Sequence, residues 1–443
     1  MSRLAPAACS ARATAAPTRR EPPVINATCP SSVDTAILDV MRSNDTGMSG
    51  QREPQLAAAE AEHAARVHGH IAAEILAAGG WLSFERFMDV ALYAPGLGYY
   101  SAGAHKFGGG GDFTTAPEIS ALFGACVARQ CAEVLAAVGR GGILEIGAGS
   151  GRLAADVLGR LERSGELPEH YWILEISADL RERQRRLLGE RLPHLMGRVM
   201  WLDAPPVQPF DGVILANEVL DALPVARFRR RRSRVEELGV AVDGDRFIWA
   251  ARDAGRDMAG AVDVLARAAA AAGAGEWPDG YLSEYCPRLA AWTAAVTRPL
   301  AAGAVLWFDY GLPRAHYYLP ERHDGTLLCH FRHRAHADPL RLPGLEDITA
   351  WVDFTALALA AAGAGFEVAG FTTQTYFLAG LGVDQEMLAL AQSDENRFAR
   401  LANEARRLML PGEMGERFKA MAWTRGMRAA LGGFALRDLR HVL

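Results

Sequence analysis

A short apolar segment that runs into a glycine-rich turn and then into a helical pattern constrains this fold most. Residues 143–146 are typical of a buried strand, residues 147–151 read GAGSG, and residues 152–162 have the apolar spacing of a helix. A strand joined to a helix by a glycine loop is the first unit of a doubly wound α/β sheet. In such sheets the ligand lies beyond the carboxyl ends of the strands, so we expect a ligand site over residues 147–151.

The same alternation of strand and helix continues along the chain. Strands are predicted at 143–146, 172–176, 199–202, 212–216, 303–308 and 366–371, with 434–436 as the last. Helices are predicted at 56–78, 83–92, 119–138, 152–162 and 178–190. This order predicts a mostly parallel sheet with helices on both faces. The stretch 225–300 is too long for a crossover, so we expect an insertion between the fourth and fifth strands.

Three parts of the chain are expected. Residues 1–55 lack a hydrophobic period and are expected to form a disordered tail. Residues 56–140 are expected to form a helical cap that includes the cofactor-covering segment, and residues 141–443 the core. The first twenty residues contain four arginines and no acid, which suits a transit peptide. We favour instead an idle tail or an upstream start codon, because Met41 and Met48 also precede the ordered region.

The glycine loop differs from the dinucleotide fingerprint, because Arg152 stands where the third glycine of GxGxxG belongs. This argues against a pyrophosphate ligand. Glu175 ends the second strand, 28 residues past Gly147, where a carboxylate can accept both hydroxyl hydrogens of a ribose. Asp203 ends the third strand and is placed to face an adenine amino group. Acids at successive strand ends after a glycine loop favour S-adenosylmethionine, which has a ribose and an adenine and no phosphate.

The loop after the fourth strand, residues 216–224, contains two acids three residues apart, Glu218 and Asp221. In this architecture that loop faces the methyl group to be transferred, and two carboxylates can grip a cation there. The alternative is a helix N-terminus whose acids favour the helix dipole. We expect Glu218 and Asp221 to be catalytic, and Asn217 beside them to contact the cofactor.

Several longer strings carry a family resemblance. They are 107–120 (FGGGGDFTTAPEIS), 143–153, 172–177, 216–224 (ANEVLDALP), 309–311 (DYG), 347–354 (DITAWVDF) and 414–419 (MGERFK). With these strings the chain resembles the MidA-like family of class I S-adenosylmethionine-dependent methyltransferases, which includes the mitochondrial complex I assembly-factor arginine methyltransferase. The resemblance spans about residues 80–425. It implies a Rossmann-like class I methyltransferase sheet with an N-terminal helical cap and the insertion at 225–300.

The resemblance also implies site residues. The cofactor-holding roles fall on Gly147, Gly149, Gly151 and Glu175, and the segment that closes over the cofactor contains Gly111, Asp112, Thr115 and Pro117. Family loops often have a proline and an arginine where this chain has Ala148 and Ser150, but a backbone cradle needs neither side chain. The implied reaction is methyl transfer to an arginine nitrogen of a protein, and the family's best-described substrate is a respiratory-complex subunit.

Other functions stay open from the sequence: a small-molecule methyltransferase, a non-catalytic cofactor-binding assembly factor, and a nicotinamide oxidoreductase, which the missing third glycine disfavours. A net charge of −5 argues against nucleic acid as a partner. No uncharged run reaches the roughly 20 residues that a membrane span needs. We expect a cytoplasmic protein, or a mitochondrial matrix protein if the tail is a transit peptide.

Three further signals are given structural interpretations. Residues 227–234 contain six arginines. We interpret them as part of a solvated strand pair and not as a binding site for an acidic partner. His316, His323, His330, His333 and His336 lie close in sequence, but their spacings suit no single helical face, so we predict no metal. Cys126 and Cys131 fall in a helical segment and are predicted core residues.

Overall fold

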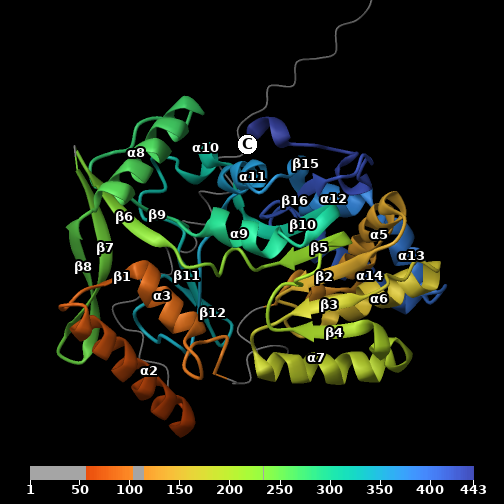
Figure 1. The fold of residues 1–443 in the computed structure, drawn as a ribbon, viewed down its shortest axis with the longest axis horizontal. Helices are drawn as coiled ribbons and strands as arrows, with labels where there is room; N and C mark the ends of the chain where they lie inside the picture. Colours follow the sequence, from red (N-terminus) through yellow and green to blue (C-terminus); the bar gives the residue numbers. More distant parts are fainter. Residues whose placement is uncertain (1–55, 103–113, 233) are drawn as a thin grey trace, which may run out of the picture. The chain divides into compact units, whose positions relative to one another are not determined.

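The structure is a computed structural model that describes residues 56–102, 114–232 and 234–443. Its main sheet has the strand order β15-β16-β10-β5-β2-β3-β4 (Figure 1). The bounds are β2 (Gly142–Ile146), β3 (Tyr171–Leu174), β4 (Val199–Leu202), β5 (Phe210–Asn217), β10 (Leu300–Leu312), β15 (Glu367–Thr373) and β16 (Phe418–Arg425). The strands from β4 to β10 are parallel, whereas β16 is antiparallel to both its neighbours. This is the doubly wound, mostly parallel sheet that the sequence predicts.

The last strand lies elsewhere than the sequence predicted. Residues 434–436 are not a strand: Gly432–Phe434 form a short 3-10 turn, η2, and the last strand is β16, Phe418–Arg425. The apolar run of β16 is only four residues long, and Lys419 lies within the strand, so the sequence gives little indication of a buried strand here. The Lys419 amine is satisfied inside the protein by the carbonyl of Arg417 at 3.1 Å. Phe434 instead packs its ring against Phe377, with centroids 5.6 Å apart.

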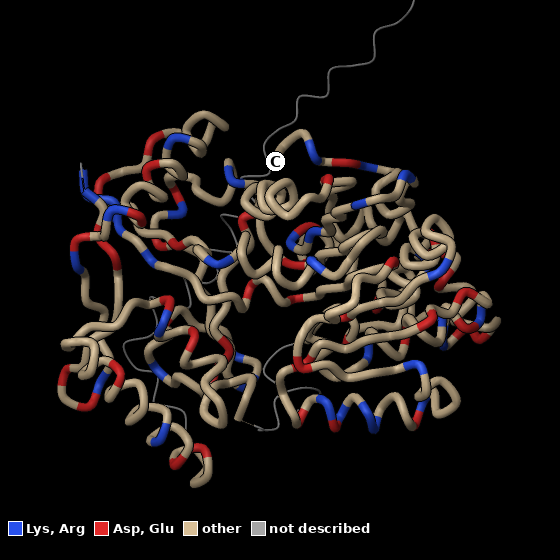
Figure 2. Tube along the Cα trace, viewed as in Figure 1, with Lys and Arg blue, Asp and Glu red and all other residues tan. Residues whose placement is uncertain are grey.

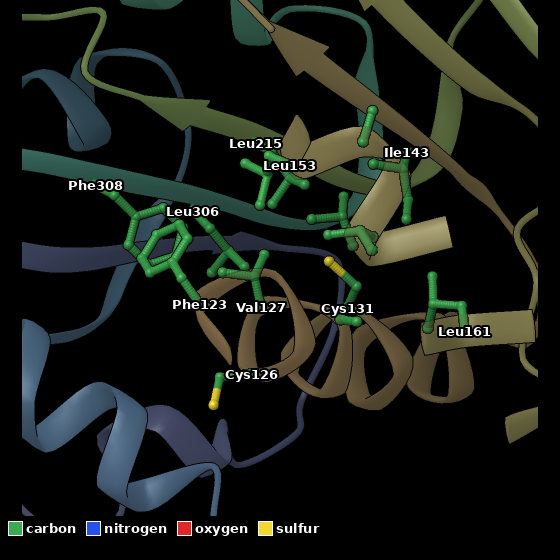
Figure 3. Close-up of a cluster of buried hydrophobic side chains, with 14 of the residues drawn as sticks. Phe123, Cys126, Val127, Cys131, Ile143, Leu153, Leu161, Leu215, Leu306 and Phe308 are labelled. Carbon is green, nitrogen blue, oxygen red and sulfur yellow. The ribbon is translucent and has the colours of Figure 1, made fainter. Parts of the chain in front are cut away.

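Side chains of the main sheet alternate between two apolar cores. On one face the helices are α5 (Ala121–Val138), α6 (Arg152–Ser164), α7 (Ala178–Arg191), α12 (Gln374–Gly380), α13 (Val383–Ala391) and α14 (Glu395–Met409). The other face is covered by α9 (Leu289–Thr297) and α11 (Phe354–Gly363). In β10, Leu306 and Phe308 belong to the first core and Trp307 to the second. Figure 3 shows Leu306 and Phe308 beside Phe123 and Val127 of α5.

Helix α5 is apolar because it is a core helix. It is the one helix in the described part of the chain that is long and apolar enough to cross a membrane, yet 67% of it is buried inside the protein. It packs on the main sheet, although the sequence grouped it with residues 56–140. Cys126 and Cys131 are buried in it, as expected, and burial raises the pKa of both thiols. By contrast, α7 carries charges of both signs along its length (Figure 2).

The N-terminal helices join the predicted insertion in a second sheet. Its order is β1-β7-β6-β9, with β8 paired to β7. The bounds are α2 (Ala58–Ala77), β1 (Leu82–Ser83), α3 (Phe84–Tyr93), β6 (Ala226–Arg231), β7 (Arg234–Asp243), β8 (Arg246–Asp253), α8 (Arg256–Ala271) and β9 (Leu282–Tyr285). Because β1 pairs antiparallel with β7, segments some 150 residues apart form one layer. The final part of 225–300 differs, since α9 packs on the main sheet.

The arginine run forms the predicted strand pair. It lies on β6 and β7, where Arg229 and Arg234 bond to the two carboxylate oxygens of Glu236 at 2.7 and 2.9 Å. A third, smaller sheet and several short helices complete the described chain. The third sheet consists of β11 (Leu328–Phe331), β12 (Arg334–His336) and β13 (Asp347–Thr349), whereas β14 (Val352–Asp353) pairs with β10 of the main sheet. The short helices are α4 (Ala116–Ile119), α10 (Arg314–Tyr317), η1 (Pro193–Arg198) and η3 (Arg440–Val442).

Candidate active site

A cavity of about 510 Å³ lies at the carboxyl ends of β2, β3, β4 and β5. Its size is within the range of small-molecule sites. One side, the strand-end wall, consists of the glycine loop and the residues that follow β3 and β4. Another part of the lining, the helix wall, comes from α3, the turn after it and the region around α9. The loop after β5 lines the cavity as well.

The glycine loop supports a close approach of a ligand to the backbone. Gly147, Gly149 and Gly151 have φ values of 65°, 53° and 87°, in the left-handed region that favours glycine. A Cβ on Gly151 would lie 3.1 Å from Gln184 Cγ, whereas nothing lies within 4 Å of a Cβ on Gly149. Gly147 and Gly149 line the cavity, and Gly149 leaves open space there. Gly151 is not a lining residue; it allows α6 to pack closely on α7.

Glu175 is a buried carboxylate at the strand-end wall, 5% exposed. Its Oε1 accepts the backbone N–H of Ser177 at 2.9 Å, and its Oε2 accepts the side-chain amide of Gln184 at 3.2 Å. Burial raises its pKa, and these hydrogen bonds oppose that rise. Each carboxylate oxygen has a further lone pair, so the fixed group can still accept ligand hydroxyls.

Asp203 lies at the open rim of the cavity, with 92% of its side chain exposed. Its Oδ1 is 2.6 Å from Nη2 of Arg181. Arg181 also donates from Nε to the carbonyl of Glu175 at 2.6 Å and from Nη2 to the carbonyl of Leu202 at 2.8 Å. It therefore clamps the ends of β3 and β4 together. Sequence reasoning missed this role, because one arginine in an arginine-rich helix gives no signal.

The residues after β5 form a strained turn. Glu218 has φ 53°, an uncommon value for a residue other than glycine, and its N–H donates to the carbonyl of Phe308 at 2.8 Å. The side-chain amide of Asn217 donates to Glu218 Oε1 at 3.0 Å. Both residues line the cavity. Burial, and then the nearby charge of Asp221, raise the pKa of Glu218 to about 8.

Asp221 lies behind the cavity wall and does not line it. It is 6% exposed, and its Oδ2 accepts the hydroxyl of Tyr310 at 2.6 Å. Burial raises its pKa to about 6. Asp309, fully buried beside it, accepts the backbone N–H groups of Leu220 at 3.0 Å and Asp221 at 3.3 Å. The two predicted catalytic acids are thus in different positions: Glu218 faces the ligand space and Asp221 supports the loop.

Sequence reasoning assigned no role to Asp309 and Tyr310, although the string DYG contributed to the resemblance. It also missed Tyr93 and Tyr100, which line the helix wall. The available signal was their position: Asp309 and Tyr310 come at the end of the fifth strand of the main sheet, beside the β5 loop. For the two tyrosines no sequence pattern indicated contact with the site.

The predicted covering segment is partly seen. Thr115 and Pro117 line the cavity, whereas Gly111 and Asp112 fall outside the described residues. The hydroxyl of Ser150 donates to Oε1 of Glu118, which ties this segment to the glycine loop. Among the described residues, no group of three or more His, Cys, Asp or Glu side chains is arranged to hold a metal ion. His336 pairs with Glu346 instead, at 2.9 Å.

Comparisons with known proteins agree with this geometry. Residues 126–372 match the family described as "Putative S-adenosyl-L-methionine-dependent methyltransferase". A curated relative from Danio rerio, "Protein arginine methyltransferase NDUFAF7, mitochondrial", is 30% identical over 79% of this chain and 85% of its own. The human protein of that name is 28% identical over 77% and 80%.

A solved structure is similar over a longer stretch. It is a Burkholderia thailandensis protein bound to S-adenosyl-homocysteine, 40% identical, with a TM-score of 0.83 over 88% of this chain and 100% of that one. The parallel sheet, the open glycine loop and the buried acid after β3 are the parts of this chain that would hold such a ligand. The chain therefore belongs to the family of S-adenosylmethionine-dependent methyltransferases.

Proposed function

We propose that this chain methylates a guanidinium nitrogen of an arginine in a protein substrate. The observation that carries the proposal is Glu218, a carboxylate held in a strained turn at the cavity, with Oε1 fixed by Asn217. A carboxylate at this point binds a planar cation through paired hydrogen bonds. The relatives named protein arginine methyltransferases support the same acceptor.

The cofactor-binding residues in this proposal are those of the strand-end wall. Gly147 and Gly149 offer backbone, Gly149 also leaves open space, Glu175 accepts the ribose hydroxyls, and Asp203 at the rim contacts the adenine amino group. Asn217 at the end of β5 contacts the cofactor as well, and Thr115, Pro117, Gly111 and Asp112 belong to the proposed covering segment. S-adenosylmethionine supplies an electrophilic methyl group carried on a sulfonium.

Glu218 has two tasks toward the acceptor. A guanidinium is protonated at neutral pH, with a pKa above 12, so its nitrogen must lose a proton when the new N–C bond forms and the S–C bond breaks. The Glu218 carboxylate orients the cation and takes up that proton. Asp221 acts through the loop as a positioning residue, since its carboxylate contacts Tyr310 and not the cavity. Catalysis is then mainly orientation and removal of water.

Two alternative functions differ from this proposal in what becomes methylated. A small-molecule methyltransferase would use the same cavity without a protein acceptor, and a non-catalytic assembly factor would bind the cofactor without turnover. For the protein substrate we propose a respiratory-complex subunit, on the family resemblance. The compartment stays a prediction: the cytoplasm, or the mitochondrial matrix. The names of the relatives support a mitochondrial location.

The test is to incubate the protein with labelled S-adenosylmethionine and a lysate depleted of the enzyme, followed by amino-acid analysis of the labelled protein. Labelled methylarginine is expected; it should disappear with Gly149→Val and fall strongly with Glu218→Gln. Label found only in small molecules, or on another amino acid, would contradict the proposal. Cofactor binding without any label would favour the assembly factor.

A further inference from the structure

The helix wall of the cavity contains an aromatic pair. Tyr93 is the last residue of α3, and Tyr100 follows the turn after that helix. Their ring centroids are 5.6 Å apart and their planes differ by 21°. Both tyrosines line the cavity together with Asp89, which precedes Tyr93 by four residues and so shares its face of the helix. The pair therefore lines the ligand space from α3 and the turn after it, whereas the proposed cofactor-binding residues come from the strand ends.

A tight turn places the second tyrosine on the first. The N–H of Gly98 donates to the carbonyl of Ala94 at 2.7 Å, and the N–H of Tyr100 donates to the carbonyl of Leu92 at 2.9 Å. A Cβ on Gly98 would lie 2.5 Å from the carbonyl carbon of Leu92, so only glycine permits this approach. Tyr99, fully buried, packs edge-on against Tyr100 at 5.1 Å. The stacked geometry is thus fixed by the backbone.

Both hydroxyl groups are used within the protein. The Tyr93 hydroxyl donates to the carbonyl of Ala222 at 2.8 Å, and the Tyr100 hydroxyl donates to Oδ1 of the buried Asp347 at 2.8 Å. The surface that the pair offers the cavity is therefore mainly ring carbon and π-electron density. The bond to Ala222 also attaches the pair to the same loop that carries Glu218.

We propose that Tyr93 and Tyr100 are specificity-determining residues that select a guanidinium over an ammonium as the acceptor. The inference rests on the proposed function, because it takes Glu218 as the anionic contact for the acceptor. A carboxylate attracts both kinds of cation. An aromatic surface discriminates between them. A guanidinium is planar, delocalised and weakly hydrated and stacks on rings, whereas an ammonium is compact and strongly hydrated.

The experiment measures cation binding without relying on turnover. The full chain loaded with S-adenosyl-homocysteine is titrated with ethylguanidinium and with propylammonium by ligand-observed NMR. The wild type should bind ethylguanidinium at least tenfold more tightly. Tyr93→Leu and Tyr100→Leu should reduce that ratio to about twofold or less while the S-adenosyl-homocysteine affinity stays within twofold. Tyr93→Phe, which keeps the ring, is the matched control and should retain the preference.

A second measurement needs no variant. In protein that carries protons only on its tyrosine rings, saturation of these protons should transfer to bound ethylguanidinium. No transfer, no preference in the wild type, or an unchanged ratio in folded Leu variants would each overturn the proposal. Glu218→Gln tests the proposed function apart from the role of the tyrosines, because it should weaken the binding of both cations about equally. If Glu218→Gln changes neither cation's affinity, the proposed function fails, whatever the tyrosine variants show.

Discussion

The carboxylate of Asp309 accepts the backbone N–H of Leu220 at 3.0 Å, although the two residues are 89 positions apart in the chain. Its other oxygen accepts the N–H of Tyr310 at 2.9 Å, and the Tyr310 hydroxyl bonds to Asp221. The end of β10 thus holds the loop after β5 at several points. This loop contains Glu218, whose backbone would otherwise relax from its strained conformation.

Asp309→Asn should lower kcat at least tenfold and leave the affinity for S-adenosylmethionine within a few fold. The amide offers one oxygen where the carboxylate offered two, so at least one of the three backbone N–H groups loses its acceptor. A buried N–H group left without its acceptor costs roughly 1–3 kcal/mol, and a loss of that size in the free energy of unfolding is expected. Steady-state kinetics, calorimetry and denaturant unfolding check these values.

Asp211→Asn is the control for this variant, because Asp211 is an exposed acid in the same strand, β5, at its other end. It should change neither stability nor kcat. Wild-type turnover in folded Asp309→Asn would show that the loop keeps its shape without this contact.

The methylation rate should depend on pH through Glu218. Because burial raises its pKa to about 8, the carboxylate is protonated in the free protein below that value and ionised above it. We therefore expect kcat/KM to rise with pH and to level off above about 8, since the acceptor cation requires the ionised form. Glu218→Gln should lose most turnover and the pH dependence of what remains, while cofactor affinity stays within a few fold.

The stability of the protein should depend on pH in the opposite direction and fall as the pH rises. A pKa that is higher in the folded than in the unfolded protein gives a contribution that is complete below about 4.5 and is lost as the pH rises through about 8. Melting temperatures of the wild type should fall across this window more steeply than those of Glu218→Gln. If the melting temperatures of the two proteins change in parallel across these pH values, the pKa of Glu218 is not raised.

Gly149→Val should abolish cofactor binding without unfolding the protein. No atom lies within 4 Å of an added Cβ, so the side chain enters open cavity space and meets the ligand rather than the protein. Some backbone strain is expected because φ is 53°. Gly151→Val is the informative contrast: its Cβ would meet Gln184 at 3.1–3.3 Å, so it should lower the melting temperature as well. Calorimetry and thermal melts of both variants decide between these outcomes.

Glu175→Ala should weaken S-adenosylmethionine binding at least tenfold. The fixed carboxylate is proposed to accept ribose hydroxyls, and each such bond is worth roughly 1.5–3 kcal/mol. Glu190→Ala, at an exposed position of α7, is the control and should bind like the wild type. If Glu175→Ala binds the cofactor with wild-type affinity, the ribose is held elsewhere. Tight binding of NAD by the wild type would instead revive the oxidoreductase alternative.

Local signals in the sequence were enough for most of the main sheet, although not for β16, which was predicted in the wrong place. The apolar strand at 143–146, the glycine loop and the helix after it need only neighbouring residues to be recognised, and the structure confirms them. The helix predicted at 83–92 is likewise confirmed as α3, which Ser83 caps by accepting the N–H of Arg86 at 3.3 Å. Strand ends then indicated Glu175 and Glu218, because parallel strands bring their carboxyl ends to one edge of a sheet.

Tertiary structure alone decided which acids face the ligand and what surrounds them. Glu218 and Asp221 are equivalent in sequence, yet a left-handed backbone at Glu218 directs one toward the cavity and leaves the other against Tyr310. Tyr100 meets Asp347 across 247 positions, a contact that no periodic pattern encodes. The physical reason is that periodicity reports which face of an element is buried, whereas a site depends on the side chains that packing brings together from distant elements.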